Sequence, residues 1–223
     1  PYPVDLPGFG EGRIMPQSES SMLVPELIAK RWKGGRILDM CCGRGVKTGQ
    51  LADILPEAHI EAWDISEGKI KSARFEMMRM HTEERVTFKT GDSLSLVPDE
   101  APSAILLDAP CTGSGTWGRH PESKWRCSPE QVQQNSLLQK QLLERAVSLA
   151  APGGIIAYST CSLFRDENEK VIADVMGRHP ELIELPAERT AKFMVKGKPY
   201  GTTVMPSLPW VDGFYMTLLA KRK

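Results

Sequence analysis

The chain has 223 residues, 41% of them hydrophobic and 25% charged, which is ordinary for one globular domain. Lys plus Arg and Asp plus Glu number 28 each, so the zero formal net charge argues against a purely electrostatic nucleic-acid binder and still permits a local basic patch. No apolar run reaches the ~18 residues of a membrane span, and the chain opens without a signal segment. These features argue against a membrane partner.

The chain contains five cysteines, an odd number, and no two of them have C-x-x-C spacing. This pattern is typical neither of a disulfide framework nor of a zinc site. We therefore expect free thiols, no metal centre and a reducing, cytoplasmic location.

From residue 36 onward, short apolar runs alternate with amphipathic segments. Strands are predicted at 36–41, 59–65, 85–92, 104–110 and 154–161, and helices at 46–55, 66–80, 128–154 and 165–179. Ser66 and Ser128 are predicted N-caps. Two closing strands are predicted at 182–187 and 213–223. Residues 1–33 are predicted to form an N-terminal arm that becomes helical near Ser18 and packs on the main domain.

Strand–helix alternation of this kind predicts an α/β domain over residues 34–223, with a doubly wound, mostly parallel, seven-stranded sheet. Such a sheet binds its ligand at the carboxyl ends of the strands, near the point where the strand order reverses. The residues that follow each predicted strand are therefore the candidate site.

The first predicted strand runs into the loop DMCCGRGVKTG, residues 39–49. Gly43 and Gly45 permit a tight turn that presents a helix N-terminus to a ligand. The phosphate-loop and dinucleotide motifs both fail, because Val46 and Thr48 stand where those motifs need glycine. On these residues alone, an ordinary tight turn is the simpler interpretation. The loop residues assigned to a cofactor are Cys41, Cys42, Gly43, Arg44, Gly45, Val46 and Lys47.

Acidic residues end the first three predicted strands. Asp64 suits a ribose diol and Asp92 suits an exocyclic amine, although either can also cap the next helix. Three such acids in succession, Asp39, Asp64 and Asp92, favour an adenosine-type ligand. The lack of a phosphate-binding motif favours S-adenosylmethionine over NAD or ATP.

The segment DAPCTGSGTWGRHPESKW (108–125) is followed by YSTCSLFRDENEKVI (158–172). Their Pro110-Cys111 and Thr160-Cys161 pairs resemble the two cysteine motifs of the Nol/Nop/Sun (Fmu-type) cytosine-5 RNA methyltransferases. MPQSESSML (15–23) and DGFYMTLLAKRK (212–223) also resemble that family, so the likeness covers nearly the whole chain. The first loop departs from it: the family reads Cys-Ala-Ala-Pro-Gly-Gly-Lys-Thr, and this chain reads CCGRGVKT.

The resemblance implies a class I, Rossmann-like fold with S-adenosylmethionine as methyl donor. It also implies Cys161 as the nucleophile and Cys111 as the thiol that assists release. The chemistry agrees, because carbon 5 of cytosine is a poor nucleophile until a thiolate adds to carbon 6. A second acid/base group must then help to remove the proton and the thiol. Asp108 is placed to hydrogen-bond the ring and, with Asp64 and Asp92, is also assigned to the cofactor site. Sheet geometry alone permits either thiol to reach the base.

Basic and aromatic residues follow Cys111 in the sequence. Trp117 and Trp125 are candidate stacking surfaces, although a solvated loop with partly buried tryptophans explains them almost as well. The cations assigned to RNA are Arg119, His120, Lys124 and Arg126.

We therefore predict a monomeric enzyme that methylates carbon 5 of a cytosine in rRNA or tRNA. One alternative is a DNA cytosine-5 methyltransferase, in which Cys111 would attack; the second cysteine and the lack of a long target-recognition insertion argue against it. Another is a non-catalytic, cofactor-binding scaffold in RNA assembly, which the altered first loop favours and the presence of both cysteines opposes. Part of RNA recognition is expected on an N-terminal extension outside this sequence, so the chain alone should bind RNA weakly, with a shallow salt dependence.

Overall fold

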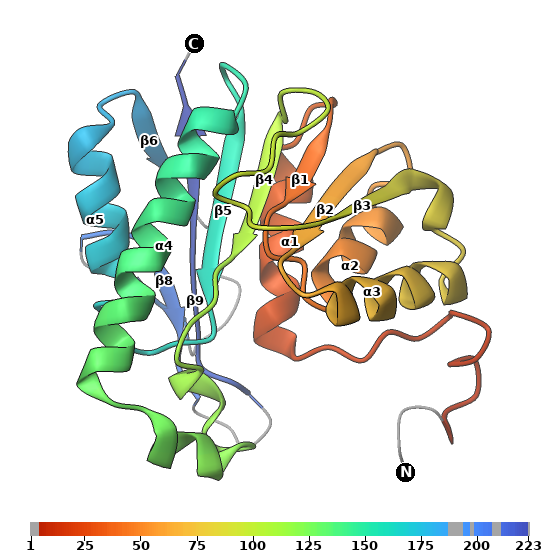
Figure 1. Cartoon of the computed structure of the whole chain (residues 1–223), viewed down its shortest axis with the longest axis horizontal. Helices are drawn as coiled ribbons and strands as arrows, with labels where there is room; N and C mark the ends of the chain where they lie inside the picture. The colour runs from red at the N-terminus through yellow and green to blue at the C-terminus, as the bar shows by residue number, and fades with distance from the viewer. Residues whose placement is uncertain (1–4, 187–193, 197–198, 207–210, 223) are drawn as a thin grey trace.

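The structure is a computed structural model that describes residues 5–186, 194–196, 199–206 and 211–222. Residues 1–4 of the predicted arm lie outside the described residues, as do Ala187 and Lys223, the last residues of the two predicted closing strands. Within the described part, one sheet has the strand order β3-β2-β1-β4-β5-β9-β8-β7, and β6 pairs with β9 (Figure 1).

Five strands run parallel and form the centre and one edge of the sheet. They are β1 (Ile37–Asp39), β2 (Ile60–Asp64), β3 (Val86–Thr90), β4 (Ala104–Asp108) and β5 (Ile155–Thr160). The remaining strands pair antiparallel: β6 (Leu182–Leu185), β7 (Met194–Lys196), β8 (Thr202–Val204) and β9 (Phe214–Lys221). β1, β2 and β5 are buried along their whole length, as expected for strands covered by helices on both faces.

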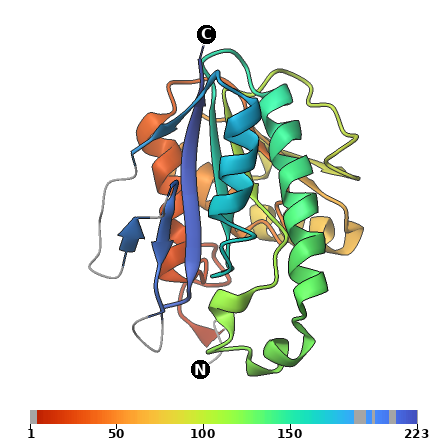
Figure 2. The same cartoon turned by 90° about the vertical axis from the view of Figure 1, so that its left-hand side faces the viewer.

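Helices cover both faces of the sheet, so the molecule has three layers. One face carries α1 (Glu19–Arg31), α2 (Val46–Ile54) and α3 (Glu67–Arg79); the other carries α4 (Pro129–Leu149) and α5 (Glu169–Arg178) (Figure 2). The described residues also form the short 3-10 turns η2 (Glu83–Arg85), η3 (Ser114–Thr116) and η4 (Pro121–Arg126). Each face has its own apolar cluster, built on Leu51 and Ile70 on one side and on Leu142 and Val171 on the other.

The predicted caps are confirmed. Ser66 Oγ accepts from the Lys69 N–H at 3.4 Å, and Ser128 Oγ accepts from the Gln131 N–H at 3.3 Å. The helix predicted over 165–179 begins only at Glu169, because the residues before it turn toward the cysteine loops.

The doubly wound, mostly parallel fold is confirmed, but the prediction of seven strands is wrong, since nine are present in the described part of the chain. The two extra strands, β7 and β8, have three residues each. Segments this short show no apolar alternation, and they become strands because β8 pairs with β9. No helix in the described ranges is long and apolar enough to cross a membrane.

Candidate active site

The reversal of strand order lies between β1 and β4, which pair although α2, β2, α3 and β3 separate them in the sequence. At such a point the connections leave on opposite faces of the sheet and open a crevice at the carboxyl ends. A cavity of about 330 Å³ lies there. It is lined by Asp39, Cys41–Arg44, Val46–Lys47, Asp108 and Arg119, together with Pro16–Ser18 and Ser21 of the N-terminal region.

The first loop turns tightly because two glycines adopt left-handed backbone angles, with φ of 57° at Gly43 and 82° at Gly45. Gly45 is also the N-cap of α2, and a Cβ atom there would lie 2.9 Å from the Cβ of Ala73 on α3. A side chain at this position would therefore separate the loop from α3. Val46 and Lys47 begin α2 and line the cavity, so the N-terminus of this helix faces it.

Cys41 and Cys42 also line the cavity, but both remain protonated thiols. Burial raises the pKa of each well above its usual value, and the nearby Asp39 adds to the effect. Since the thiolate is the attacking form of cysteine, these two residues can border a ligand and are poor nucleophiles.

Asp39 ends β1 and is 1% exposed. Thr48 Oγ1 donates to its Oδ2 atom at 2.7 Å, and Oδ1 has no hydrogen-bond partner in the described structure. Burial raises the pKa of Asp39 to about 7, although the Thr48 hydrogen bond acts in the opposite direction. Asp39 is therefore a carboxyl that gains or loses its proton near neutral pH.

Asp64 ends β2 and holds the first loop in place. Its Oδ2 accepts from the Gly43 N–H at 3.0 Å, its Oδ1 accepts from the Ser66 N–H at 2.9 Å, and Lys69 Nζ lies 3.5 Å away. Oδ1, with one donor, still has a lone pair for a further donor. Asp92 is exposed, and its Oδ1 accepts from the Leu94 N–H at 2.9 Å, an arrangement typical of a loop turn.

Asp108 ends β4 inside the crevice, beside two donors from neighbouring elements. Lys47 Nζ lies 2.6 Å from its Oδ2, and Ser159 Oγ on β5 donates to its Oδ1 at 2.8 Å. Lys47 also lies 5.3 Å above the ring of Phe214. The carboxylate is therefore held in one orientation at the cavity wall, with the Lys47 ammonium beside it.

The predicted catalytic thiols meet. Cys111 follows β4 and Cys161 follows β5, and the two Sγ atoms are 3.3 Å apart. The backbones of their loops are joined as well, because the Gly115 N–H donates to the Cys161 carbonyl at 2.9 Å and the Gly213 N–H donates to the Gly115 carbonyl at 2.8 Å. A Cβ atom on Gly115 would lie 2.0 Å from the Gly213 carbonyl oxygen, so only glycine fits at this crossing.

The two thiols have opposite tendencies to ionise. The hydrogen bond between them lowers the pKa of Cys161 below its usual value and raises that of Cys111 well above it. Burial opposes ionisation of both; for Cys161 the Asp108 charge also opposes it, while the Lys47 charge favours it. The contact between the two sulfur atoms therefore favours ionisation of Cys161 over ionisation of Cys111.

The four predicted RNA-binding cations lie in different settings. Arg119 donates through Nε to Asp212 Oδ1 at 2.9 Å and through Nη2 to Oδ2, so this bidentate ion pair neutralises its charge beside the cavity. His120 lies 3.7 Å from Glu122 and is exposed. The other two, Lys124 and Arg126, are exposed on η4.

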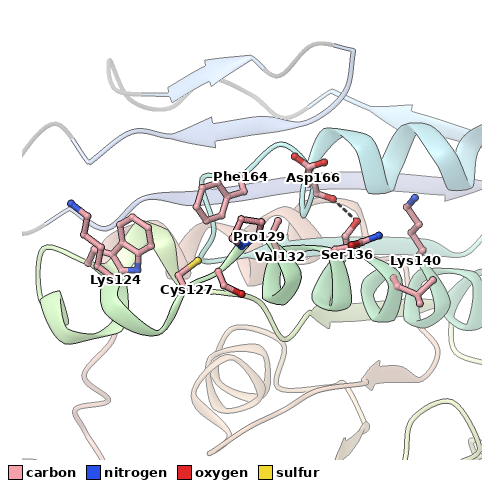
Figure 3. A pocket seen from close by; sticks show the side chains of 12 residues that line it. Lys124, Cys127, Pro129, Val132, Ser136, Lys140, Phe164 and Asp166 are labelled. Atoms are coloured by element: carbon pink, nitrogen blue, oxygen red, sulfur yellow. Dashed lines mark hydrogen bonds between the residues drawn. The ribbon is translucent and has the colours of Figure 1, made fainter.

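A groove of about 930 Å³ runs between η4 and the first half of α4 on one side and the loop after Cys161 on the other (Figure 3). Lys124 and Lys140 lie at its two ends, with Phe164 between them. Trp117 packs edge-on against Phe164, with ring centroids 6.0 Å apart. Trp125, the next residue after Lys124, is 89% exposed.

Sequence reasoning missed several residues of this site. Ser159 and Asp212 contact predicted residues directly, and both stand inside the motif segments, next to Thr160-Cys161 and at the start of the closing segment. Glu167 contacts the residues that follow both cysteines. Its position in the second cysteine motif was the available signal, but its side-chain partners depend on the fold.

A family model described as "16S rRNA methyltransferase RsmB/F" matches residues 27–220, which is most of the chain. The chain belongs to this family. It is 35% identical over 208 residues to the ribosomal RNA small subunit methyltransferase B of Thermus thermophilus, covering 93% of this chain and 50% of that protein. The resemblance predicted from the paired cysteine motifs is therefore confirmed.

Solved structures agree with the fold of this RsmB/F family member. The crystal structure of PH0851 matches with a TM-score of 0.89 and 32% identity, over 97% of this chain and 49% of that one. NSun6 from Pyrococcus horikoshii, solved with SFG, matches with a TM-score of 0.87 and 24% identity, over 100% of this chain and 57% of that one. The chain spans about half the length of the curated relatives it matches.

Proposed function

We propose that this chain is the catalytic domain of an rRNA methyltransferase that transfers a methyl group from S-adenosylmethionine to carbon 5 of a cytosine. The observation that carries the proposal is the 3.3 Å separation of the Cys111 and Cys161 sulfur atoms at the carboxyl ends of adjacent strands. A cytosine-5 transfer needs one thiolate to attack and a second group to manage the proton on release. The description of the RsmB/F family supports rRNA as the substrate class.

Cys161 is the proposed nucleophile. Its pKa is lowered chiefly by the hydrogen bond from Cys111, so it supplies the thiolate that adds to carbon 6 of the base. The protonated Cys111, 3.3 Å away, is placed to take part in elimination once the methyl group has been transferred. This division supports the RNA-type mechanism over the DNA-type alternative, in which Cys111 would attack.

Asp108 is the proposed contact to the cytosine ring. Lys47 and Ser159 hold its carboxylate at the cavity wall, so it can accept a hydrogen bond from the amino group or from a protonated ring nitrogen. Lys47 favours the thiolate of Cys161 from the same position. The acid, the cation and the two thiols thereby surround one base taken out of the RNA stack.

The first loop and Asp64 are the proposed cofactor-binding residues, with Asp92 at the adenine end. The cavity of about 330 Å³ is within the size range of small-ligand pockets, and the α2 N-terminus and Asp64 offer the donors and acceptors that an adenosine group needs. S-adenosylmethionine supplies the methyl group when bound. The altered sequence CCGRGVKT keeps the glycine turn, so the scaffold alternative loses its main support.

The proposed RNA path runs over η4 and the groove beside it. Lys124, Arg126 and Lys140 provide exposed or half-exposed cations for phosphates, and the exposed Trp125 indole offers a stacking face. Arg119 is better placed to orient Asp212 and the cavity wall than to neutralise a phosphate. The proposal also includes an N-terminal arm over residues 1–33 that packs on the catalytic domain of residues 34–223. It further includes a monomeric state and a cytoplasmic location.

The test is transfer of a radioactive methyl group to rRNA, tRNA and duplex DNA by wild-type protein, Cys161→Ala and Cys111→Ala. We expect transfer to rRNA, no adduct or turnover with Cys161→Ala, and accumulation of a protein–RNA adduct with Cys111→Ala on a denaturing gel. An adduct in Cys161→Ala and none in Cys111→Ala would reverse the two roles. Transfer to DNA alone would reject the RNA assignment.

A further inference from the structure

Glu167 is a buried carboxylate between the second cysteine loop and α5. It is 0% exposed, and it follows Cys161 by six residues. The mechanism above gives it no chemical step, and it is not among the residues that line the cavity. A buried carboxylate is unfavourable unless donors surround it, so its partners are informative.

Five donors surround this carboxylate, and all are uncharged. Oε1 accepts from the Thr112 N–H at 2.9 Å and from the side-chain amides of Asn135 at 3.1 Å and Gln139 at 3.2 Å. Oε2 accepts from Thr112 Oγ1 at 2.6 Å and from the hydroxyl of Ser162. Thr112 directly follows Cys111, and Ser162 directly follows Cys161. One side chain therefore binds the residue after each catalytic thiol.

The backbone around Glu167 is fixed too. The Tyr158 hydroxyl on β5 donates to the Glu167 carbonyl at 2.6 Å. Asn168, the next residue, donates to the Ser162 carbonyl at 2.9 Å and accepts from Thr160 Oγ1 at 2.6 Å. Hydrogen bonds to β5 and α4 therefore fix Glu167 in position beside the cysteine loops.

We propose that Glu167 is the positioning residue that holds the Cys111 and Cys161 loops together, so that the two sulfur atoms stay within contact of each other. This role rests on the proposed function, because it matters for turnover only if both thiols act on one base. Glu167 thereby acts on the geometry of the two thiols, without touching the substrate.

The donor pattern predicts which substitutions preserve this contact. A glutamine amide can place its oxygen at the Oε1 position, facing the N–H donors, and its NH₂ at the Oε2 position, where the two hydroxyls can rotate to accept. Glu167→Gln should therefore keep the loops together. Glu167→Asp keeps the charge but is one methylene shorter, and Glu167→Ala leaves the donors unpaired. Glu61→Ala is the matched control. Glu61 is also a buried carboxylate, but it lies on β2, where it binds Trp63, Asp99 and Lys89.

The first experiment measures thiol geometry without any catalysis. Dibromobimane bridges two close thiols, each thiolate displacing one bromide, and the bridged product is fluorescent. For each variant, the background rate is measured in the same protein with Cys111→Ala added and is subtracted. The corrected bridging rate should match wild type in Glu167→Gln and Glu61→Ala. It should fall at least about tenfold in Glu167→Asp and Glu167→Ala. Equal rates in all variants would overturn the proposal.

The second experiment measures turnover on rRNA. We expect kcat to fall about 100-fold in Glu167→Asp, the loss typical of a misplaced catalytic group. The KM for S-adenosylmethionine should be unchanged, and Glu167→Gln should restore most of kcat. If Glu167→Ala does not fold, the comparison of Glu167→Gln with Glu167→Asp is the test. An active Glu167→Asp and an inactive Glu167→Gln would show that the charge of Glu167 matters and the position of its carboxylate does not, which would overturn the proposal. Wild-type protein that bridges normally yet methylates no RNA would reject the proposed function and leave the positioning role standing.

Discussion

Replacing Asp39 by asparagine should change how the free energy of unfolding depends on pH. Asp39 is fully enclosed at the end of β1, and burial raises its pKa from 3.8 to about 7 in the folded protein. Between these two values the folded state holds a proton that the unfolded chain has released. The stabilising contribution is therefore fully present below pH ~4 and is lost as the pH rises through about 7.

The size of the effect follows from the two pKa values. One pKa unit corresponds to about 1.4 kcal/mol, so the whole difference is about 4 kcal/mol. Part of it is already lost at pH 5, because the unfolded carboxyl is ionised there. Between pH 5 and pH 8 the wild-type protein should lose about 2.5 kcal/mol relative to Asp39→Asn, whose amide carries no titrating proton.

Urea unfolding at pH 5, 6, 7 and 8 measures this difference, and groups shared by both proteins cancel in the comparison. Thr48→Val is an informative companion, because it removes the hydrogen bond that lowers the Asp39 pKa and should move the loss of stability to higher pH. Parallel curves for wild type and Asp39→Asn would refute the reasoning, since they would show that Asp39 ionises at its ordinary pKa despite its burial.

Three further predictions concern other parts of the site and the fold. Asp64→Ala should weaken S-adenosylmethionine binding by about 1.5–3 kcal/mol in calorimetry; unchanged affinity with an intact fold would leave Asp64 as a loop cap. His179→Gln should lower Tm more at pH 6 than at pH 9, because two glutamates raise the folded-state pKa of His179 and that contribution disappears as the pH rises through it; equal losses would contradict this. Gly115→Ala should destabilise the protein by about 2 kcal/mol or more and abolish turnover, because its Cβ would meet the Gly213 carbonyl. Gly118→Ala, whose Cβ would meet nothing within 4 Å, is the control and should match wild type in thermal unfolding.

The local order of the chain follows from the sequence alone. Apolar runs and cap residues predicted all nine α-helices and strands from 36 to 179, and the same pattern predicted the sheet class. The start of α5 was predicted four residues too early, because the carboxylate of Glu167 binds the cysteine loops and the helix begins at Glu169. Hydrophobic periodicity acts over a few residues, so it predicts elements that lie within an apolar run, such as β1, and misses β7 (MVK) and β8 (TTV), which do not.

Motif spacing also determined where chemistry would be found, because parallel strands place their carboxyl ends at one edge of a sheet. What the tertiary structure decided is which of those residues meet. Most of the decisive contacts join residues about 30 to 90 positions apart or bring neighbouring loops together. They are the contact and opposite ionisation of Cys111 and Cys161, the pairing of Arg119 with Asp212, and the five donors on Glu167. Such contacts depend on side-chain direction and on the exclusion of water, and both exist only once the two faces of the sheet have been packed.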